Sequence, residues 1–249
     1  MAAVHENTVG EMVANRPGLA RVFERFGIDY CCGGKRTLED AATRAGADYA
    51  AVLAALEAAD QSAGEFDPTA LSLADLCEHI VETHHAYLRR ELPRIDRLLD
   101  KVVAAHGERH PEVLEVRRVF GAFATDLVQH MAKEELVLFP AICRLEQDRR
   151  YPVGPFGSVR NPMNMMEAEH EEAGNALAVM RAATDDFSPP ADACPTFRAL
   201  LGALAELEGD MFRHVHKENN VLFPRAVRLE DELIRAGASP GSPRDLPVR

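Results

Sequence analysis

No run of apolar residues in the sequence approaches the roughly 18 that a membrane-spanning helix needs. Residues 1–16 also lack the apolar core of a secretory signal. Basic residues are scarce beside acidic ones, 28 against 40, which gives a net charge of −12 with no basic stripe to offset it. Such a charge repels phosphate backbones and anionic lipid. We therefore expect a cytoplasmic protein that binds neither nucleic acid nor membrane.

Disulfide-framework spacing is absent as well. The five cysteines form an odd set in a chain of 249 residues, which favours reduced thiols. Cys77 and Cys143 lie within apolar helical patterns and are expected to be inert core residues. Cys194 lies in a proline-flanked linker where the sequence suggests no partner. The adjacent pair Cys31 and Cys32 differs from the others because two glycines follow it in a short loop.

Strand signals are nearly absent, and the sequence predicts an all-α protein. Residues 1–60 are expected to form a small domain of four short helices, followed by a linker over 61–70. Residues 71–236 are expected to form an antiparallel four-helix bundle, and 237–249 a disordered tail. The long helices are expected over about 72–105, 111–146, 163–183 and 196–236.

An internal repeat lies within the predicted bundle. HMAKEELVLFP, starting at His130, and HVHKENNVLFP, starting at His214, share the pattern HxxKExxVLFP. Each copy places a histidine four residues before a glutamate, Glu134 in the first and Glu218 in the second. Residues at this spacing lie on one helix face about one turn apart, so both side chains can reach the same point inside a bundle.

The two remaining long helices each supply one more histidine. His170 lies on the third helix, and either His84 or His85 matches it on the first. Four imidazoles and two carboxylates in a bundle core are costly unless they are compensated, and metal ions compensate them. The number of ligands suggests two metals. If both carboxylates bridge, an oxo or hydroxo bridge would leave one coordination position open on each metal. These ligands suit iron, zinc or manganese.

Other histidines and acids near these motifs have competing interpretations. His79 is a weaker ligand candidate, His216 points away from His214, and His106 and His110 are expected to be solvated in a turn. Two acids, Glu135 and Glu169, directly neighbour predicted ligands. Either they belong to a solvated face, or they form a polar path or proton relay to the metals.

Taken together, the HxxKExxVLFP repeats with His85 and His170 resemble a hemerythrin-like domain. The segment DYCCGGKRTLEDA, residues 29–41, resembles the small domain that precedes it in the RIC (repair of iron centres) family of the YtfE/ScdA type. The resemblance covers about residues 1–235. It favours His85 over His84, because the family's first ligand precedes a stretch similar to LRREL (residues 88–92) at the distance found for His85.

By this resemblance the metals are two non-haem iron ions, with an oxo or hydroxo bridge. The two glutamates are the bridging carboxylates among the implied ligands, which are His85, His130, Glu134, His170, His214 and Glu218. The resemblance implies a bacterial cytoplasmic protein that helps to repair iron–sulfur clusters damaged by nitric oxide or oxidants. It would donate iron, or bind or reduce nitric oxide, so whether it is an enzyme stays open.

The implied partners are damaged iron–sulfur proteins, with nitric oxide or oxygen as a small ligand, and the chain would be a monomer or a homodimer. The main alternative is a hemerythrin-like sensor or carrier of oxygen or nitric oxide. A metal-free interaction protein fits the paired HxxxE motifs poorly. A zinc hydrolase would need a zinc ion with three protein ligands and a nearby base. The repeated, symmetric set of four histidines and two glutamates fits that arrangement poorly.

The cysteine pair gains a role from the same resemblance. Cys31 and Cys32 would act in iron relay, in contact with the client protein or in redox sensing. The basic neighbours Lys35 and Arg36 are expected to favour the thiolate. The alternative is a structural turn whose thiols are incidental.

Overall fold

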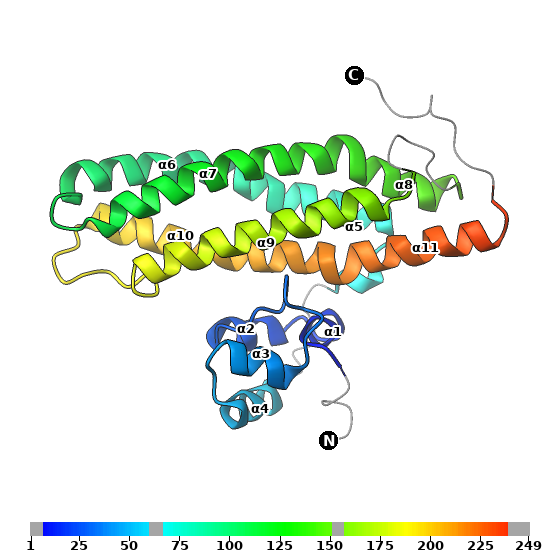
Figure 1. Ribbon diagram of the computed structural model, residues 1–249, viewed down its shortest axis with the longest axis horizontal. Helices are drawn as coiled ribbons and strands as arrows, with labels where there is room; N and C mark the ends of the chain where they lie inside the picture. Colours follow the sequence, from blue (N-terminus) through cyan, green and yellow to red (C-terminus); the bar gives the residue numbers. More distant parts are fainter. Residues whose placement is uncertain (1–6, 60–66, 151–156, 239–249) are drawn as a thin grey trace. The chain divides into compact units, whose positions relative to one another are not determined.

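A computed structural model describes residues 7–59, 67–150 and 157–238 of the chain. Apart from one isolated bridge between Thr8 and Thr37, these residues contain helices and turns only, so the all-α prediction is confirmed (Figure 1). None of the described helices has the length and apolar character needed to cross a bilayer. Most of the predicted linker, and nearly all of the predicted tail, lie outside the described residues.

By contacts, the chain divides into two compact units. The first unit comprises residues 1–80, 138–167 and 212–249, and the second comprises 81–137 and 168–211. The predicted boundaries of the small domain and the bundle stay a prediction.

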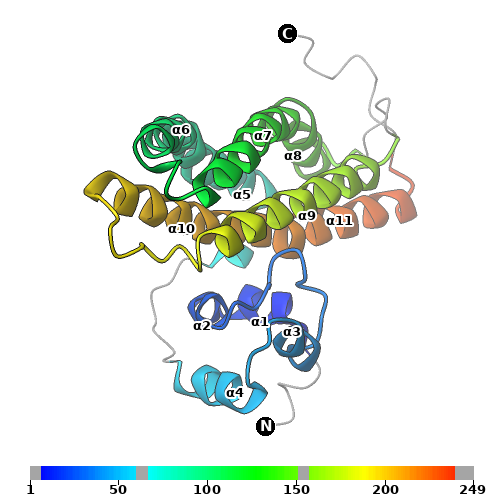
Figure 2. The same ribbon diagram turned by 60° about the vertical axis from the view of Figure 1, so that its left-hand side comes forward.

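The first unit begins with the four short helices expected from the sequence, drawn in blue and cyan in Figure 2. Thr37 accepts the backbone N–H of Asp40, and Asp48 accepts that of Ala50, so local capping starts two of these helices. Gly27, with φ of +64°, lies just beyond the end of another. Phe23, Ile28, Tyr30, Leu38 and Val52 belong to a buried apolar core among these helices. The four helices are α1 (Val9–Asn15), α2 (Leu19–Arg25), α3 (Leu38–Arg44) and α4 (Tyr49–Ala58).

The four predicted long helices are present, three of them in segments. A single turn of 3-10 helix, η2 (Pro68–Ala70), comes before them. In chain order, the segments are α5 (Leu73–Ile80), η3 (Val81–His85) and α6 (Ala86–His106); α7 (Glu112–Lys133), η4 (Glu134–Leu138) and α8 (Phe139–Gln147); α9 (Arg160–Ala183); and α10 (Pro195–His216), η5 (Lys217–Leu222) and α11 (Phe223–Arg235).

Within the first unit, α8 packs against both α5 and α11. Ser72 Oγ accepts the backbone N–H of Asp75 at 3.0 Å and so caps the start of α5. The carboxylate of Glu146 on α8 also accepts the N–H groups of Leu73 and Ala74, at 2.9 and 3.0 Å. This long-range cap ties the start of α5 to α8.

Within the second unit, α6 and α7 pack against each other on either side of a short turn. The buried residues Leu88, Leu92, Ile95 and Leu99 follow the three- and four-residue spacing of one helix face. An ion pair joins α9 to α10, because Arg181 Nε donates to the buried carboxylate of Glu208 at 2.9 Å.

Three of the long helices are interrupted by a turn of π-helix, so the prediction of continuous α-helix is wrong at η3, η4 and η5. Two of these turns have a cause in the sequence. Proline lacks the N–H that would bond the carbonyl four residues earlier, and its ring crowds that carbonyl. For Pro140 and Pro224 these carbonyls belong to Leu136 and Asn220, which lie within η4 and η5. The segment η3 contains no proline and carries no such signal.

Candidate metal centre

The π turns fall at the predicted ligands. His85 is the last residue of η3, Glu134 is the first of η4, and Glu218 is the second of η5. A π turn adds a residue to the helical turn and shifts the side chains around it, and such turns often occur at functional sites. His170 differs, since it lies within the uninterrupted helix α9.

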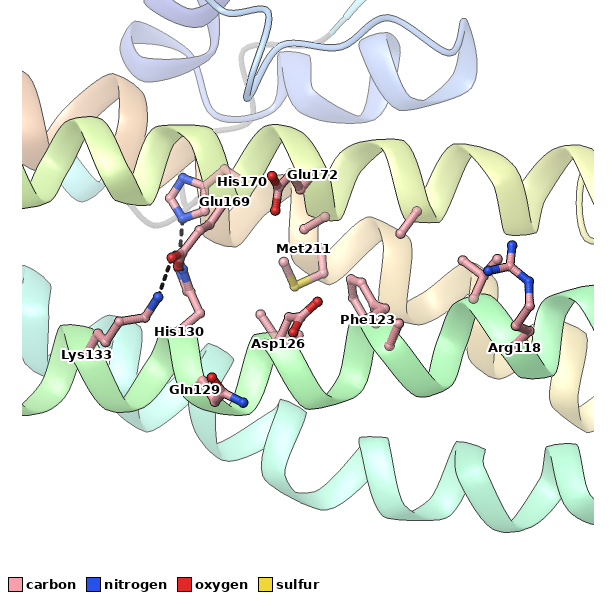
Figure 3. A pocket seen from close by; sticks show the side chains of 15 residues that line it. Arg118, Phe123, Asp126, Gln129, His130, Lys133, Glu169, His170, Glu172 and Met211 are labelled. Atoms are coloured by element: carbon pink, nitrogen blue, oxygen red, sulfur yellow. Dashed lines mark hydrogen bonds and ion pairs between the residues drawn. The ribbon is translucent and has the colours of Figure 1, made fainter.

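In the second unit four predicted ligands converge. His85 Nε2 lies 3.3 Å from one carboxylate oxygen of Glu134, and His130 Nε2 lies 3.3 Å from the other. The Nε2 atoms of His130 and His170 are 3.0 Å apart. Figure 3 shows these two rings pointing toward each other from facing helices. All four residues are at most 3% exposed, so their polar atoms lie in a nearly dry core.

The first unit carries the other two predicted ligands. His214 Nε2 and Glu218 Oε1 are 3.0 Å apart, and neither residue is exposed. This contact is the i, i+4 pairing that the repeat predicts.

Six residues supply the ligand atoms of two metal-capable groups, and within each group these atoms lie no more than 4.8 Å apart. Both groups contain Glu134 and Glu218, and each adds two imidazoles. This donor set fits a pair of metal ions that share two carboxylates, and its chemistry suits iron, zinc or manganese. The first group is His85, Glu134, His214 and Glu218. The second group is His130, Glu134, His170 and Glu218.

A cavity of about 360 Å³ adjoins this part of the second unit (Figure 3). His130 and His170 line it together with Asp126, Glu172 and Met211. The cavity gives a small molecule space beside two of the imidazoles.

Two glutamates form hydrogen bonds with the Nδ1 atoms of predicted ligand histidines. Glu135 Oε1 lies 2.6 Å from His85 Nδ1, and Glu169 Oε2 lies 2.7 Å from His130 Nδ1. A carboxylate at Nδ1 fixes the tautomer that donates there and leaves the Nε2 lone pair for a metal. The sequence suggested a solvated face or a polar path for these acids. The solvated-face interpretation is wrong, because both carboxylates contact buried imidazoles.

Cations keep these two carboxylates ionised. Arg89 donates to both oxygens of Glu135, at 2.6 and 2.7 Å, and Lys133 forms an ion pair with Glu169. Partial burial raises the pKa of each carboxyl, but hydrogen bonds from the cation and the histidine outweigh it, so both pKa values lie below the usual range.

The repeat is not symmetrical in these supporting positions. Asn219 occupies the repeat position of Glu135, and His84 occupies that of Glu169. His84 instead contacts Asp210, with Nδ1 and Oδ1 2.9 Å apart, and belongs to neither metal-capable group. Each group therefore contains one histidine held by a glutamate, His85 in one and His130 in the other.

Glu169→Gln is expected to weaken metal binding roughly 10- to 100-fold, because His130 loses the anion that orients its ring and raises its basicity. Glu172→Gln is the matched control, since Glu172 is exposed and lines the same cavity. Competition with a chromogenic chelator measures both affinities. Equal affinities in the two variants would show that the contact of Glu169 with His130 has no role in metal binding.

Two other predictions about histidines, those for His106 and His110, are wrong. His106 is buried rather than solvated, and its Nε2 lies 3.2 Å from Cys194 Sγ, so Cys194 has a partner that the sequence did not suggest. His110 is also largely covered and contacts the carboxylates of Glu112 and Asp192, at 2.9 and 3.0 Å. The cause is long-range, because the loop before α10 folds back onto the turn between α6 and α7. His79 and His216 belong to neither group of ligands.

The remaining thiols follow the prediction in part. Cys77 is buried, as expected of a core residue. Cys143 is half-buried, and a hydrogen bond with Cys77 lowers the pKa of its thiol, so the description of Cys143 as inert core is incomplete.

The cysteine loop is organised around Asp29. Its carboxylate accepts the backbone N–H groups of Cys31, Cys32 and Gly33, at 3.1, 2.9 and 2.8 Å, and the thiol of Cys31 at 3.2 Å. The two thiol sulfurs are 3.8 Å apart. Together Asp29, Cys31 and Cys32 form a third group whose ligand atoms lie within 4.8 Å of one another.

The expected effect of the basic neighbours on Cys31 is wrong. The hydrogen bond with Cys32, burial, and the nearby Asp29 raise the pKa of the Cys31 thiol well above its usual value. Arg36 is 3.7 Å from Asp29, and Lys35 pairs with Glu167 at 3.3 Å, so both cations already face carboxylates.

The loop is attached to η5 through Asn220, two residues after Glu218. The Asn220 amide donates to the carbonyl oxygens of Tyr30 and Cys31, at 3.3 and 3.0 Å. A Cβ on Gly34 would collide with Asn220 Oδ1 and lie 2.8 Å from the backbone carbonyl oxygen of Tyr30, so glycine suits this close approach. The sequence marked the CCGG segment, but it gave no sign that Asp29 and Asn220 would hold it.

Comparison with known proteins gives two family matches. Residues 5–60 match ScdA_N, a domain of unknown function, and residues 78–226 match the hemerythrin HHE cation binding domain. The chain is 36% identical over 226 residues to the iron-sulfur cluster repair protein YtfE of Musicola paradisiaca, covering 90% of this chain and 98% of that one. It is 34% identical over 225 residues to the YtfE of Enterobacter sp., with the same coverage. It is 33% identical over 225 residues to a probable iron-sulfur cluster repair protein of Haemophilus influenzae, covering 89% and 97%.

Proposed function

Because the chain belongs to the family of iron–sulfur cluster repair proteins that carry a hemerythrin HHE cation-binding domain, we propose that it is a non-haem di-iron protein of the bacterial cytoplasm. It helps to restore iron–sulfur clusters damaged by nitric oxide or oxidants, and its partners are the damaged proteins. The observation that carries this proposal is the pair of ligand groups that share Glu134 and Glu218.

In this proposal each residue of the centre has a role. His85 and His214 would hold one iron and His130 and His170 the other, and Glu134 and Glu218 would be shared between them. Glu135 and Glu169 hold the rings of His85 and His130 so that Nε2 faces the metal. When bound, the iron pair would supply redox chemistry, and the cavity beside His130 and His170 would give nitric oxide or oxygen access to it.

We further propose that iron is cargo as well as cofactor, and that the cysteine loop takes part in its transfer. Thiols are soft ligands, and Asp29 adds a carboxylate within the same group as Cys31 and Cys32. Cys32 is half-exposed, so an ion held there could pass to a client protein. A simple carrier of oxygen or nitric oxide has no need for this loop, which favours repair over the carrier alternative.

The first test is the metal content of protein purified from iron-sufficient cells, measured by elemental analysis. About two iron ions per chain would support the proposal. Transfer is then tested with a hydro-lyase whose iron–sulfur cluster has been damaged by nitric oxide, by following the recovery of its activity with and without this protein. One zinc ion, or no metal, would contradict the di-iron assignment.

Cys31→Ser combined with Cys32→Ser is expected to leave the iron content unchanged but to slow cluster repair severalfold, because hydroxyl groups are poor ligands for iron beside thiolates. Cys77→Ser is the control for loss of a thiol outside the loop. Iron analysis and recovery of the damaged enzyme measure the two effects separately. Repair at the wild-type rate would mean that CCGG is a structural turn with incidental thiols.

A further inference from the structure

Two thiols outside the cysteine loop lie together in the first unit. Cys77 is on α5 and Cys143 is on α8, and these two helices pack against each other. Cys77 is buried, whereas Cys143 is half-buried and so within reach of a small solute. Neither belongs to any of the three groups of metal-capable residues described above, so neither has a role in the proposed iron chemistry.

The cap at the start of α5 fixes how the two helices meet. Glu146 on α8 accepts the N–H groups of Leu73 and Ala74, so the first turn of α5 lies beside the last turn of α8. One turn further along α5 is Cys77, and one turn earlier along α8 is Cys143. Residues three or four apart share a helix face, so both thiols lie on the contacting faces of their helices.

The two thiols are also in direct contact. A hydrogen bond with Cys77 lowers the pKa of the Cys143 thiol below its usual value, although burial and the nearby carboxylate of Glu146 act in the opposite direction. The thiolate is the reactive form of cysteine, so Cys143 is the nucleophile of the pair and Cys77 is the thiol that can resolve its products. Cys31 in the cysteine loop differs, because its contacts raise the pKa of its thiol.

We propose that Cys143 and Cys77 form a peroxide-sensitive pair that closes to a disulfide between α8 and α5. The Cys143 thiolate attacks one oxygen of hydrogen peroxide, the O–O bond breaks, and hydroxide leaves, which gives a sulfenic acid. The Cys77 sulfur then attacks the Cys143 sulfur, an S–S bond replaces the S–O bond, and the oxygen leaves as water with the Cys77 proton. Two electrons pass from the two sulfurs to the peroxide.

The bridge joins two segments that lead to proposed iron ligands. His85 follows Cys77 by eight residues, and Glu134 precedes Cys143 by nine. Thiols already in contact need little backbone movement to close a disulfide. The bridge closes a long loop and restricts the unfolded chain, so the bridged protein should melt roughly 10 °C higher than the unbridged one. This inference stands on the packing of α5 and α8 and does not depend on iron.

The test is peptide mass spectrometry of the full-length, metal-loaded protein after treatment with hydrogen peroxide, removal of the peroxide with catalase and alkylation of the remaining thiols. Trypsin releases Cys77 in residues 45–89 and Cys143 in residues 134–144, and neither peptide contains another cysteine. We expect these two peptides to become joined, and dithiothreitol to separate them. In Cys77→Ser the sulfenic acid has no resolving thiol, so dimedone should label Cys143 several times more than in the wild type.

Cys194→Ser is the matched control, because Cys194 is another half-buried thiol and contacts the imidazole of His106. It should leave the yield of the joined peptides unchanged. Absence of the joined peptides in the wild type, at a peroxide dose that oxidises Cys32, would overturn the proposal, as would equal joining of Cys143 to Cys194. Equal melting temperatures of peroxide-treated wild type and Cys143→Ser would overturn the stabilising effect of the bridge. Metal analysis of the same samples separates these outcomes from a failure of the di-iron proposal.

Discussion

Glu218→Gln is expected to reduce the metal content from about two ions per chain to less than one. Glu218 belongs to both metal-capable groups, so a neutral amide in its place removes an anionic ligand from each metal. The helical content should change little, because the chain has an extensive apolar core that requires no metal. Elemental analysis and far-ultraviolet circular dichroism measure the two quantities on one sample.

His130→Ala gives a graded comparison for the same prediction. His130 belongs to only one of the two groups, so its loss should release one metal more readily than the other. Glu82→Gln is the control, since Glu82 is exposed and lies three residues before His85. Full occupancy in Glu218→Gln would remove Glu218 from the ligand set. Equal losses in Glu218→Gln and His130→Ala would contradict the distinction between bridging and terminal ligands.

Much of the candidate centre could be predicted from sequence because its pattern is local. The i, i+4 pairs His130 with Glu134 and His214 with Glu218 follow from helix geometry alone. The matched repeat adds His170 and narrows the first ligand to His84 or His85. The π turns η4 and η5 also have a local signal in the prolines that follow them, although that signal predicts a disturbance and not its form.

The supporting contacts could not be predicted, because they join residues far apart in the chain. Glu169 lies 39 residues from His130, and whether it faces an imidazole or solvent depends on how α7 and α9 pack. Cys194 contacts His106, which is 88 residues away in the sequence. Asn220 donates a hydrogen bond to Cys31 in the cysteine loop, 189 residues away. The thiol of Cys31 shows the same limit. Nearby basic residues in the sequence suggested a thiolate, but the hydrogen bond with Cys32, burial and Asp29 raise the pKa of this thiol.

Removal of the metals is expected to lower the melting temperature strongly. Each metal at about a thousandfold excess over its Kd contributes about 4 kcal/mol of stability, so two contribute about 8 kcal/mol. For a chain of this size, 1 kcal/mol corresponds to roughly 2–4 °C, so the shift on chelation should be on the order of 15–30 °C. Differential scanning calorimetry with and without a chelator measures it.

Glu134→Gln should lower the stability of the metal-bound protein and raise that of the metal-free protein. With metal, the variant binds the ions less tightly and melts lower than the wild type. Without metal, the variant removes the charge of a fully buried carboxylate whose ligand oxygen lies within 4.8 Å of that of Glu218, so the repulsion between the two carboxylates is lost. Removing one of two neighbouring buried carboxylates should then raise the melting temperature of the metal-free protein by several degrees.

The control for this reversal is Glu206→Gln, an exposed position on α10 that should leave both melting temperatures unchanged. If Glu134→Gln lowers the melting temperature equally with and without metal, Glu134 acts as a structural hydrogen-bond acceptor and not as a metal ligand. A reversal of sign has no such structural explanation, because the same amide would have to weaken one form of the core and strengthen the other. Only a charge that the metals compensate predicts both effects.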